Sequence, residues 1–160
     1  MSKEHPNIRW RIVKERLVNI VWSPSFDVQQ KYMHKRTTHK DKKAWGDDDF
    51  TIPFVTVFMN KKNIWWFPKD SKRPVYACNY GYSAYKDERG GSFDTVKNLI
   101  IRYLDIPRTK LLEDDYSWDF TGITEILRAA DKRIGQKRLS EVIEGYIPAA
   151  QEVFTERFKK

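Results

Sequence analysis

The side chains best suited to chemistry on a polyanion lie close together in residues 31–45. This tract holds six Lys or Arg residues and one acid, together with two histidines, a tyrosine and a tryptophan. Each cation of an exposed basic segment can neutralise one phosphate of a nucleic acid. The tract therefore predicts a phosphate-binding surface on a solvated loop or hairpin, made by Lys31, Lys35, Arg36, Lys40, Lys42 and Lys43.

Aromatic side chains accompany the tract. Residues 45–85 contain eleven of the twenty-three Phe, Tyr and Trp residues of the chain. An exposed ring stacks on a base with about 1–3 kcal/mol, whatever the base. Five of these residues are candidates for stacking: Trp45, Trp65, Trp66, Tyr80 and Tyr82. Most aromatic residues of a domain are buried, so we expect at most two or three of the five to be exposed enough to stack on a base.

Other cations add to this predicted interface. Lys61 and Lys62 occupy the tip of a predicted hairpin, where they are well placed to contact a phosphate backbone. Four more cations lie near the amino end: Arg9, Arg11, Lys14 and Arg16.

The positive charge is local. Residues 1–43 have a net charge of +7, residues 44–90 of +1, and residues 91–160 are neutral. Lysines scattered for solubility would not produce this asymmetry, so the charge distribution indicates a site for a partner.

A second set of residues could support hydrolysis of a phosphodiester. His34 and His39, with Asp47, Asp48 and Asp49, are ligands for a divalent metal that activates water. Against this, the spacing of the histidines is not that of a zinc site, and three consecutive aspartates entering a strand cannot all point the same way. A metal-dependent nuclease is therefore the first alternative.

Two further patterns leave other functions open. Residues 121–143 have the small residues and the cations of a helix-turn-helix, with Gln136, Lys137 and Arg138 on its second helix. The acidic segment 113–119 could contact a basic protein or cap a helix. Exposed Trp and Tyr side chains could equally be hot spots of a small modulator that binds a larger protein assembly.

Composition limits the class of protein. The 160 residues suit one ordinary domain, and 32% of them are charged. Cys78 is the only cysteine, which excludes an intrachain disulfide and a thiolate metal cluster within one chain. No apolar run approaches the ~18 residues of a membrane span or forms a signal peptide. We expect a cytoplasmic protein with no membrane contact and no cofactor.

Periodicity predicts the elements. Residues 8–22 leave two elements open: Trp10, Val13, Leu17 and Ile20 recur at helical spacing, which favours a helix, whereas Ile8, Trp10 and Ile12 alternate as in a strand. Residues 50–59 and 64–67 read as the strands of a hairpin. A third strand is expected at 75–85. Helices are expected from Ser92 to the proline at 107, at 123–134 with Thr121 as the cap, around 139–143, and from Pro148 onward.

The predicted fold is a single α+β domain. An antiparallel sheet of three or more strands lies in a sheet-rich part, 1–90, and is packed by a helical part, 91–160. The leading functional interpretation is a non-enzymatic protein that binds DNA or RNA with low sequence specificity.

Overall fold

The computed structural model describes residues 9–35, 50–67, 69–73 and 95–159, with the backbone alone at residues 31–35, 50–54 and 95. These residues form three strands and a set of helices, which confirms the predicted α+β class. In chain order the elements are α1 (Trp10–Ile20), β1 (Phe26–Lys35), β2 (Phe50–Met59), β3 (Lys62–Phe67), α4 (Thr95–Leu104), the 3₁₀ turn η2 (Arg108–Lys110), α5 (Ile123–Ala130), α6 (Gln136–Ser140), the 3₁₀ turn η3 (Ile143–Gly145) and α7 (Pro148–Phe158).

The three strands form one antiparallel sheet in the order β1-β2-β3. β1 and β2 pair along their whole length, from Phe26 opposite Met59 to Lys35 opposite Phe50. The shorter β3 pairs only with the second half of β2. β1 is not among the predicted elements, but its last residues, 31–35, agree with the prediction of a loop or hairpin for the basic tract.

A two-residue turn joins β2 to β3 and confirms the predicted hairpin. Asn60 and Lys61 have φ angles of 53° and 66°. Positive φ at both central residues is typical of the type I′ turn, whose twist matches that of the flanking strands. Asn adopts this conformation readily, whereas Lys is strained by it.

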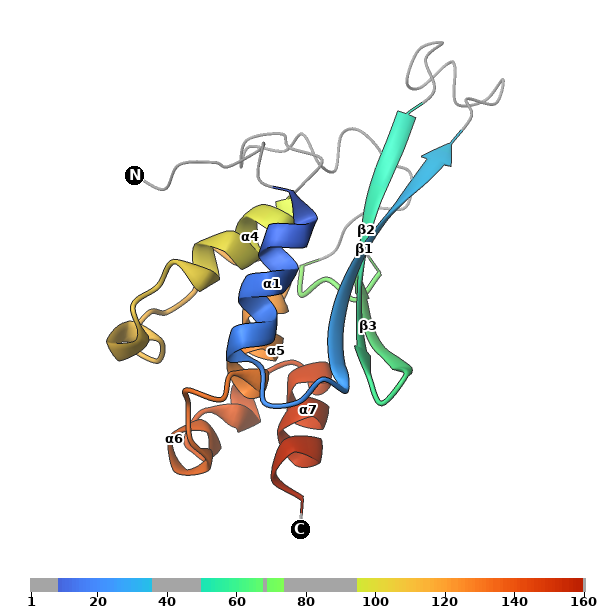
Figure 1. Ribbon diagram of the computed structural model, residues 1–160. Coiled ribbons are helices and arrows are strands. Elements are labelled where there is room, and N and C mark those ends of the chain that lie inside the picture. The colour runs from blue at the N-terminus through green and yellow to red at the C-terminus, as the bar shows by residue number, and fades with distance from the viewer. Residues whose placement is uncertain (1–8, 36–49, 68, 74–94, 160) are drawn as a thin grey trace.

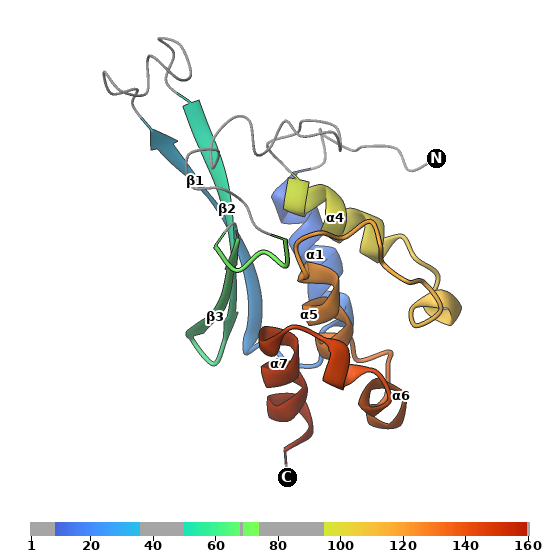
Figure 2. The ribbon, with the colours of Figure 1, turned by 180° about the vertical axis from the view of Figure 1, so that it is seen from behind.

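The long helices cover one face of the sheet. Figures 1 and 2, which are opposite views, show α1, α4, α5 and α7 on the same side of the strands, and no described helix lies on the other side. We call the covered face the inner face and the other the outer face. Because strand side chains alternate between faces, Asp27, Gln29, Phe58 and Trp66 belong to the outer face.

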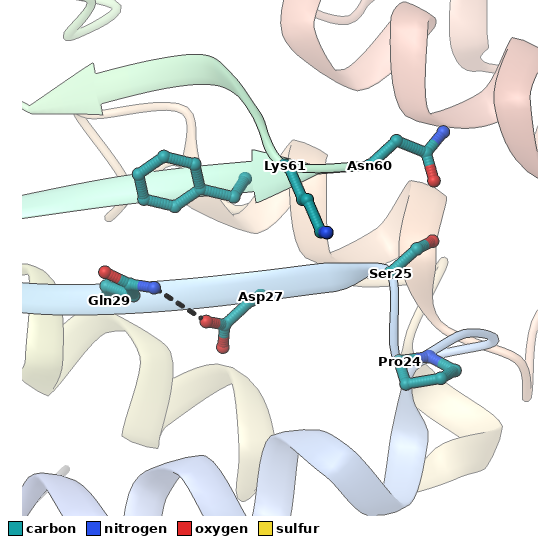
Figure 3. A pocket seen from close by; sticks show the side chains of 7 residues that line it. Pro24, Ser25, Asp27, Gln29, Asn60 and Lys61 are labelled. Atoms are coloured by element: carbon teal, nitrogen blue, oxygen red, sulfur yellow. Dashed lines mark hydrogen bonds between the residues drawn. The ribbon is translucent and has the colours of Figure 1, made fainter.

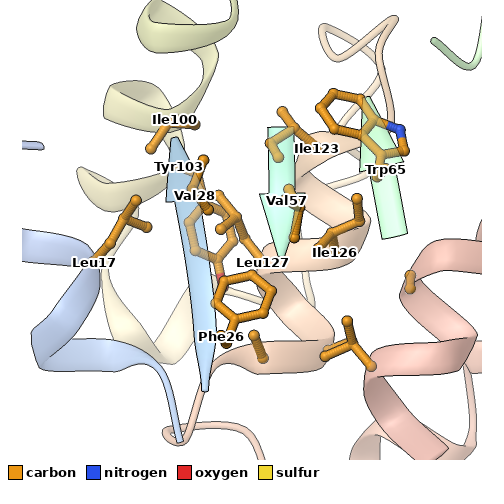
Figure 4. Packing of buried hydrophobic residues seen from close by; sticks show 14 of the residues in the cluster. Leu17, Phe26, Val28, Val57, Trp65, Ile100, Tyr103, Ile123, Ile126 and Leu127 are labelled. Atoms are coloured by element: carbon orange, nitrogen blue, oxygen red, sulfur yellow. The ribbon is translucent and has the colours of Figure 1, made fainter. Parts of the chain in front are cut away.

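The core lies between the helices and the inner face. Phe26, Val28, Val57, Trp65 and Phe67 of the strands are at most 5% exposed. Figure 4 shows several of them packed against side chains of α1, α4 and α5. Each fully buried side chain of this size contributes about 1.5–3 kcal/mol relative to an exposed one, so this layer fixes the sheet on the helices.

α5 is the central helix, and all eight of its residues are buried. The carboxylate of Asp119, three residues before the N-cap Gly122, accepts the backbone N–H groups of Gly122 at 3.1 Å and Thr124 at 2.9 Å. The predicted cap, Thr121, has a lesser part, since its hydroxyl accepts the N–H of Ile123 at 3.1 Å. Gly122 has φ 94°, and a Cβ there would lie 2.8 Å from Ile147, so this position requires glycine.

The predicted helix over 123–134 is too long by four residues, because α5 ends at Ala130. The Asp131 carboxylate accepts the backbone N–H of Arg133 at 2.9 Å, and the N–H of Lys132 donates to the carbonyl of Ile20 at 2.7 Å. An Asp side chain that binds the backbone in this way competes with the helix and ends it.

The remaining predicted elements divide into two groups. α1 confirms the helix within 8–22, α7 begins at Pro148 as predicted, and α4 and α6 lie within or beside their predicted ranges. The strand predicted at 75–85 lies outside the described residues.

Candidate nucleic-acid interface

The start of the basic tract belongs to a two-stranded ribbon. β3 pairs with β2 only as far as Val55 opposite Phe67. β1 and β2 continue together for five more pairs, residues 31–35 with 50–54. We call these residues the β1–β2 ribbon; at about 3.4 Å per residue it is roughly 17 Å long. Figure 1 shows it extending past the helices.

The register places two of the predicted phosphate ligands in this ribbon. Lys31 lies opposite Phe54, and Lys35 lies opposite Phe50. The segment 36–49, which joins the two strands, therefore begins and ends at paired residues. The other predicted ligands of the tract belong to this segment and lie outside the described residues: Arg36, Lys40, Lys42, Lys43 and Trp45.

Lys61 and Lys62 lie at the opposite end of the sheet. They follow the last residue of β2, whereas the basic segment precedes the first. A strand of ten residues is about 30 Å long. Lys62 Nζ lies 3.7 Å from the carboxylate of Glu152 on α7. Lys61 and Lys62 therefore lie at the end of the sheet that is far from the β1–β2 ribbon.

The predicted ligands on α1 are mostly balanced by acids. Arg9 is exposed and precedes the helix, but the other three cations each lie within 4.0 Å of a carboxylate. Exposed ion pairs of this kind contribute about 0–1 kcal/mol, so a phosphate would compete with an existing partner. The pairs are Arg11 with Glu15 at 3.9 Å, Lys14 with Asp27 at 3.1 Å and Arg16 with Asp105 at 2.9 Å.

Two open hollows lie beside the β2–β3 hairpin. The first has a volume of about 680 Å³ and is lined by Phe58, Lys61, Asp27 and Gln29. Figure 3 labels Lys61, Asp27 and Gln29 around it. The second, of about 470 Å³, is lined by Trp66, Lys69 and Asp70. In each hollow a half-buried aromatic side chain accompanies an exposed lysine.

The acids of these hollows are already engaged. The Asp27 carboxylate accepts a hydrogen bond from Gln29 Nε2 at 3.0 Å, drawn in Figure 3, and lies 3.1 Å from Lys14. The Asp70 carboxylate accepts the backbone N–H of Trp66 at 2.9 Å. Lys61 and Lys69, in contrast, have no ion pair with any residue in the described ranges.

The aromatic residues considered for stacking differ in their burial. Trp65 is 2% exposed and part of the core, whereas Trp66 on the outer face is half-buried. Phe58 joins Trp66 on that face, although the sequence analysis does not single it out. Trp45, Tyr80 and Tyr82 lie outside the described residues.

The buried charges of the helical half stabilise the fold. The fully buried Asp131 accepts the Tyr103 hydroxyl at 2.7 Å and Arg133 Nη2 at 2.7 Å. Burial, and then the charge of Asp131, raise the pKa of Tyr103 well above its usual value. Arg157 donates to the carbonyls of Ala129, Asp131 and Ile134 at 2.7–3.0 Å. The cluster thereby joins α4, α5 and α7.

The described residues give no support to the nuclease alternative. Among the residues with described side chains, no three His, Cys, Asp or Glu residues are grouped so as to hold a metal ion. Its predicted ligands are not among them: only the backbone of His34 is described, and His39, Asp47, Asp48 and Asp49 lie outside the described ranges.

The acidic segment and the helix-turn-helix pattern have structural explanations. The carboxylates of Asp114 and Asp115 accept the backbone N–H groups of Tyr116 and Ser117, and the hydrogen bonds from Ser117 lower the pKa of Asp115. A helix-turn-helix needs a second helix that can lie in a groove. α6 has only five residues, fewer than two turns, although its cations are exposed.

No protein-family model, curated protein or solved structure matches this chain. Within the described residues, no helix has the length and apolar character needed to cross a lipid bilayer.

Proposed function

We propose that this protein is a non-enzymatic nucleic-acid-binding protein of the cytoplasm, and that it binds phosphates with the β1–β2 ribbon and the basic segment 36–49. The register of β1 and β2 is the observation that carries the proposal. It holds the two ends of the basic segment side by side and gives Lys31 and Lys35 fixed places on the adjoining strand. Two of the six cations of the tract thus lie on the ribbon, which extends past the helices in Figure 1, and the other four follow in the sequence of the segment 36–49.

The proposed binding has low sequence specificity. Contacts to phosphates position a protein on nucleic acid but carry no sequence information. A two-stranded ribbon can enter the major groove of a duplex, and a basic surface with exposed aromatics can hold a single strand. Both modes rest on cations that displace counterions, so affinity falls steeply as salt rises.

A salt series on matched charge variants tests the proposal. Lys40, Lys42 and Lys43 are replaced by alanine in one variant. The control variant replaces Lys132, Lys137 and Arg138, which are exposed cations of the helical half with no ion pair in the described residues. Binding of labelled DNA and RNA, single- and double-stranded, is measured by fluorescence anisotropy at several salt concentrations.

The proposal expects a smaller salt slope for the first variant alone. Each lost phosphate contact reduces the slope of log K against log salt by about 0.7 on single strands and 0.9 on duplex DNA, so three contacts reduce it by about 2 to 3. Equal slopes in both variants, or an absence of binding by the unchanged protein, would refute it. Magnesium-dependent cleavage of the probe would favour the nuclease alternative instead.

A further inference from the structure

We infer that Arg128 of α5 is the centre of a second binding site, which takes an oxyanion that presents two oxygens, the carboxylate or phosphate group of a small molecule. This site goes beyond the proposed function, because it belongs to the helical half and includes no residue of the proposed nucleic-acid interface. The inference depends on a guanidinium that is buried without a counter-ion among the described residues.

The charge of Arg128 is buried but unpaired. Its side chain is 8% exposed, and its Nε donates to the carbonyl of Thr124, one helical turn earlier, at 3.2 Å. A guanidinium has five N–H donors, so four remain on the two Nη atoms. Within the described residues these four donors have no acceptor, and no carboxylate lies within 4.0 Å of them. Arginine side chains are almost never buried to this extent without a partner, because desolvation of an unpaired charge is costly.

Two tyrosine rings contact the guanidinium where an acid would be expected. Cζ of Arg128 lies over the Tyr116 ring, 3.8 Å from its centroid, and over the Tyr146 ring at 4.5 Å. A ring face attracts a cation but is a weak acceptor for N–H groups. Burial raises the pKa of both tyrosines, so both are neutral near pH 7 and neither is a counter-ion for Arg128.

The acids whose charges act on these two tyrosines are bound to other groups. Asp114 accepts the backbone N–H of Tyr116 at 2.6 Å. Asp131 is paired with Arg133 at 2.7 Å. Both carboxylate oxygens of Glu125 accept hydrogen bonds, at 2.7 and 2.8 Å. The described residues therefore leave the charge of Arg128 uncompensated.

The unpaired donors of Arg128 reach the surface. Arg128 is not among the residues whose enclosed polar atoms lack a hydrogen-bond partner, so its two Nη atoms, which also lack one, contact solvent. The hydroxyl of Tyr146 is one of those enclosed atoms. Two unsatisfied polar groups in contacting residues are uncommon in a folded protein, and here they indicate a ligand that the Nη atoms can bind from outside.

An oxyanion has the chemistry that this site lacks. The Nη donors of an arginine form a fork that matches two oxygens of a carboxylate or phosphate, at N–O distances of about 2.7–2.9 Å. A second cation lies along the same row of rings. The Trp118 ring is 5.4 Å from that of Tyr116, and Cζ of the exposed Arg102 lies 4.4 Å over it. Arg102 has no ion pair with a described residue, so it adds to the potential that attracts an anion.

The dependence of stability on added anions tests the inference. Three proteins are compared: the original chain; Arg128→Lys, which keeps the charge but loses the fork; and Arg138→Lys, which makes the same change at an exposed arginine of α6. Sodium acetate and sodium phosphate are the probes, and sodium chloride at equal ionic strength is the blank. Circular dichroism reports Tm and confirms that each variant folds.

We expect Tm of the original chain and of Arg138→Lys to rise and saturate, by about 3–6 °C at ten times the dissociation constant. Arg128→Lys should bind the same probe about tenfold more weakly or worse, because it loses at least one charge-assisted hydrogen bond. A response to acetate alone assigns the site to carboxylates, and a response to phosphate alone assigns it to phosphates.

Phosphate also stabilises proteins in general, because it is excluded from their surfaces. A rise in Tm that does not saturate, or that all three proteins share, would therefore overturn the inference. So would equal effects of the probes and of chloride.

NMR of the unchanged protein gives a result even if Arg128→Lys does not fold. The Nε–H signal of Arg128 should move and saturate as the effective probe is added, because an anion on the Nη atoms changes the whole guanidinium. The Nε–H signal of Arg157 is the internal control and should stay in place, since its Nη atoms already donate to three carbonyls. An Arg128 signal that does not respond to either probe would contradict the site.

Discussion

Asp131→Ala should destabilise the protein strongly, because this side chain anchors the cluster at the end of α5. Asp131 is fully buried and accepts hydrogen bonds from the Tyr103 hydroxyl and from the side chain and backbone of Arg133. Removal of one partner of a buried ion pair costs about 3–5 kcal/mol. The hydroxyl of Tyr103, which is 0% exposed, would also lose its acceptor, at about 1–3 kcal/mol.

Partial exposure of Arg133 lowers this total. Its side chain is 24% exposed and can turn toward water once Asp131 is gone. We therefore expect a loss of about 3–5 kcal/mol in the free energy of unfolding. For a domain of this size each kcal/mol lowers Tm by about 2–4 °C, which gives a fall of roughly 6–20 °C.

Urea unfolding and thermal scans by circular dichroism measure this loss. Tyr103→Phe is the matched variant: it removes one hydrogen bond and leaves Asp131 bound to Arg133, so it should cost only about 1.5–3 kcal/mol. A loss below about 1 kcal/mol for Asp131→Ala, far under the cost of breaking a buried pair, would show that the cluster is not the anchor we describe.

Two other predictions concern the turn and the buried tyrosines. Lys61→Gly should raise the free energy of unfolding by up to about 1 kcal/mol in urea titrations without nucleic acid, because glycine adopts the positive φ of the type I′ turn without strain; a destabilised variant would contradict the strain at this residue. Burial raises the pKa of Tyr103, Tyr116 and Tyr146, so the stability that each contributes is complete below pH ~10, the unfolded value, and is lost as pH rises through the raised folded value. Urea titrations above that pH should show falling stability, with a shallower fall for Tyr103→Phe; a pH-independent free energy would oppose this account.

Local patterns predicted much of the fold. The apolar run 50–59, the polar turn and the return strand specified the hairpin, whereas the spacing of Val13, Leu17 and Ile20 only favoured α1 over a strand. These elements depend on contacts between neighbours in sequence, which periodicity reports directly.

The errors arose where distant residues decide the structure. The end of α5 depends on Asp131, whose partners include Tyr103 of α4, and no local signal announces them. In β1, Phe26 and Val28 alternate with polar residues, as expected of a strand. The charged residues that follow, Lys31 and Lys35, made this stretch look like part of the basic tract, so the strand was not predicted.

The candidate interface was only partly predictable. The concentration of charge is visible in the sequence, but the separation of Lys61 from the first residue of β2, Phe50, by roughly 30 Å follows from the strand between them. Phe58 was passed over because a run that is apolar on both parities was interpreted as a strand covered on both faces. Its partly exposed position shows that one parity belongs to the outer face.

The central claim is that the basic ribbon contacts nucleic acid, and photo-crosslinking tests it most directly. A single-stranded oligonucleotide carrying photoreactive bases is bound to the full chain, irradiated and mapped by mass spectrometry. We predict crosslinked peptides within residues 31–67, which include the β1–β2 ribbon and the basic segment. Crosslinks confined to α5, α6 and α7, or none at a concentration that saturates binding, would contradict the account.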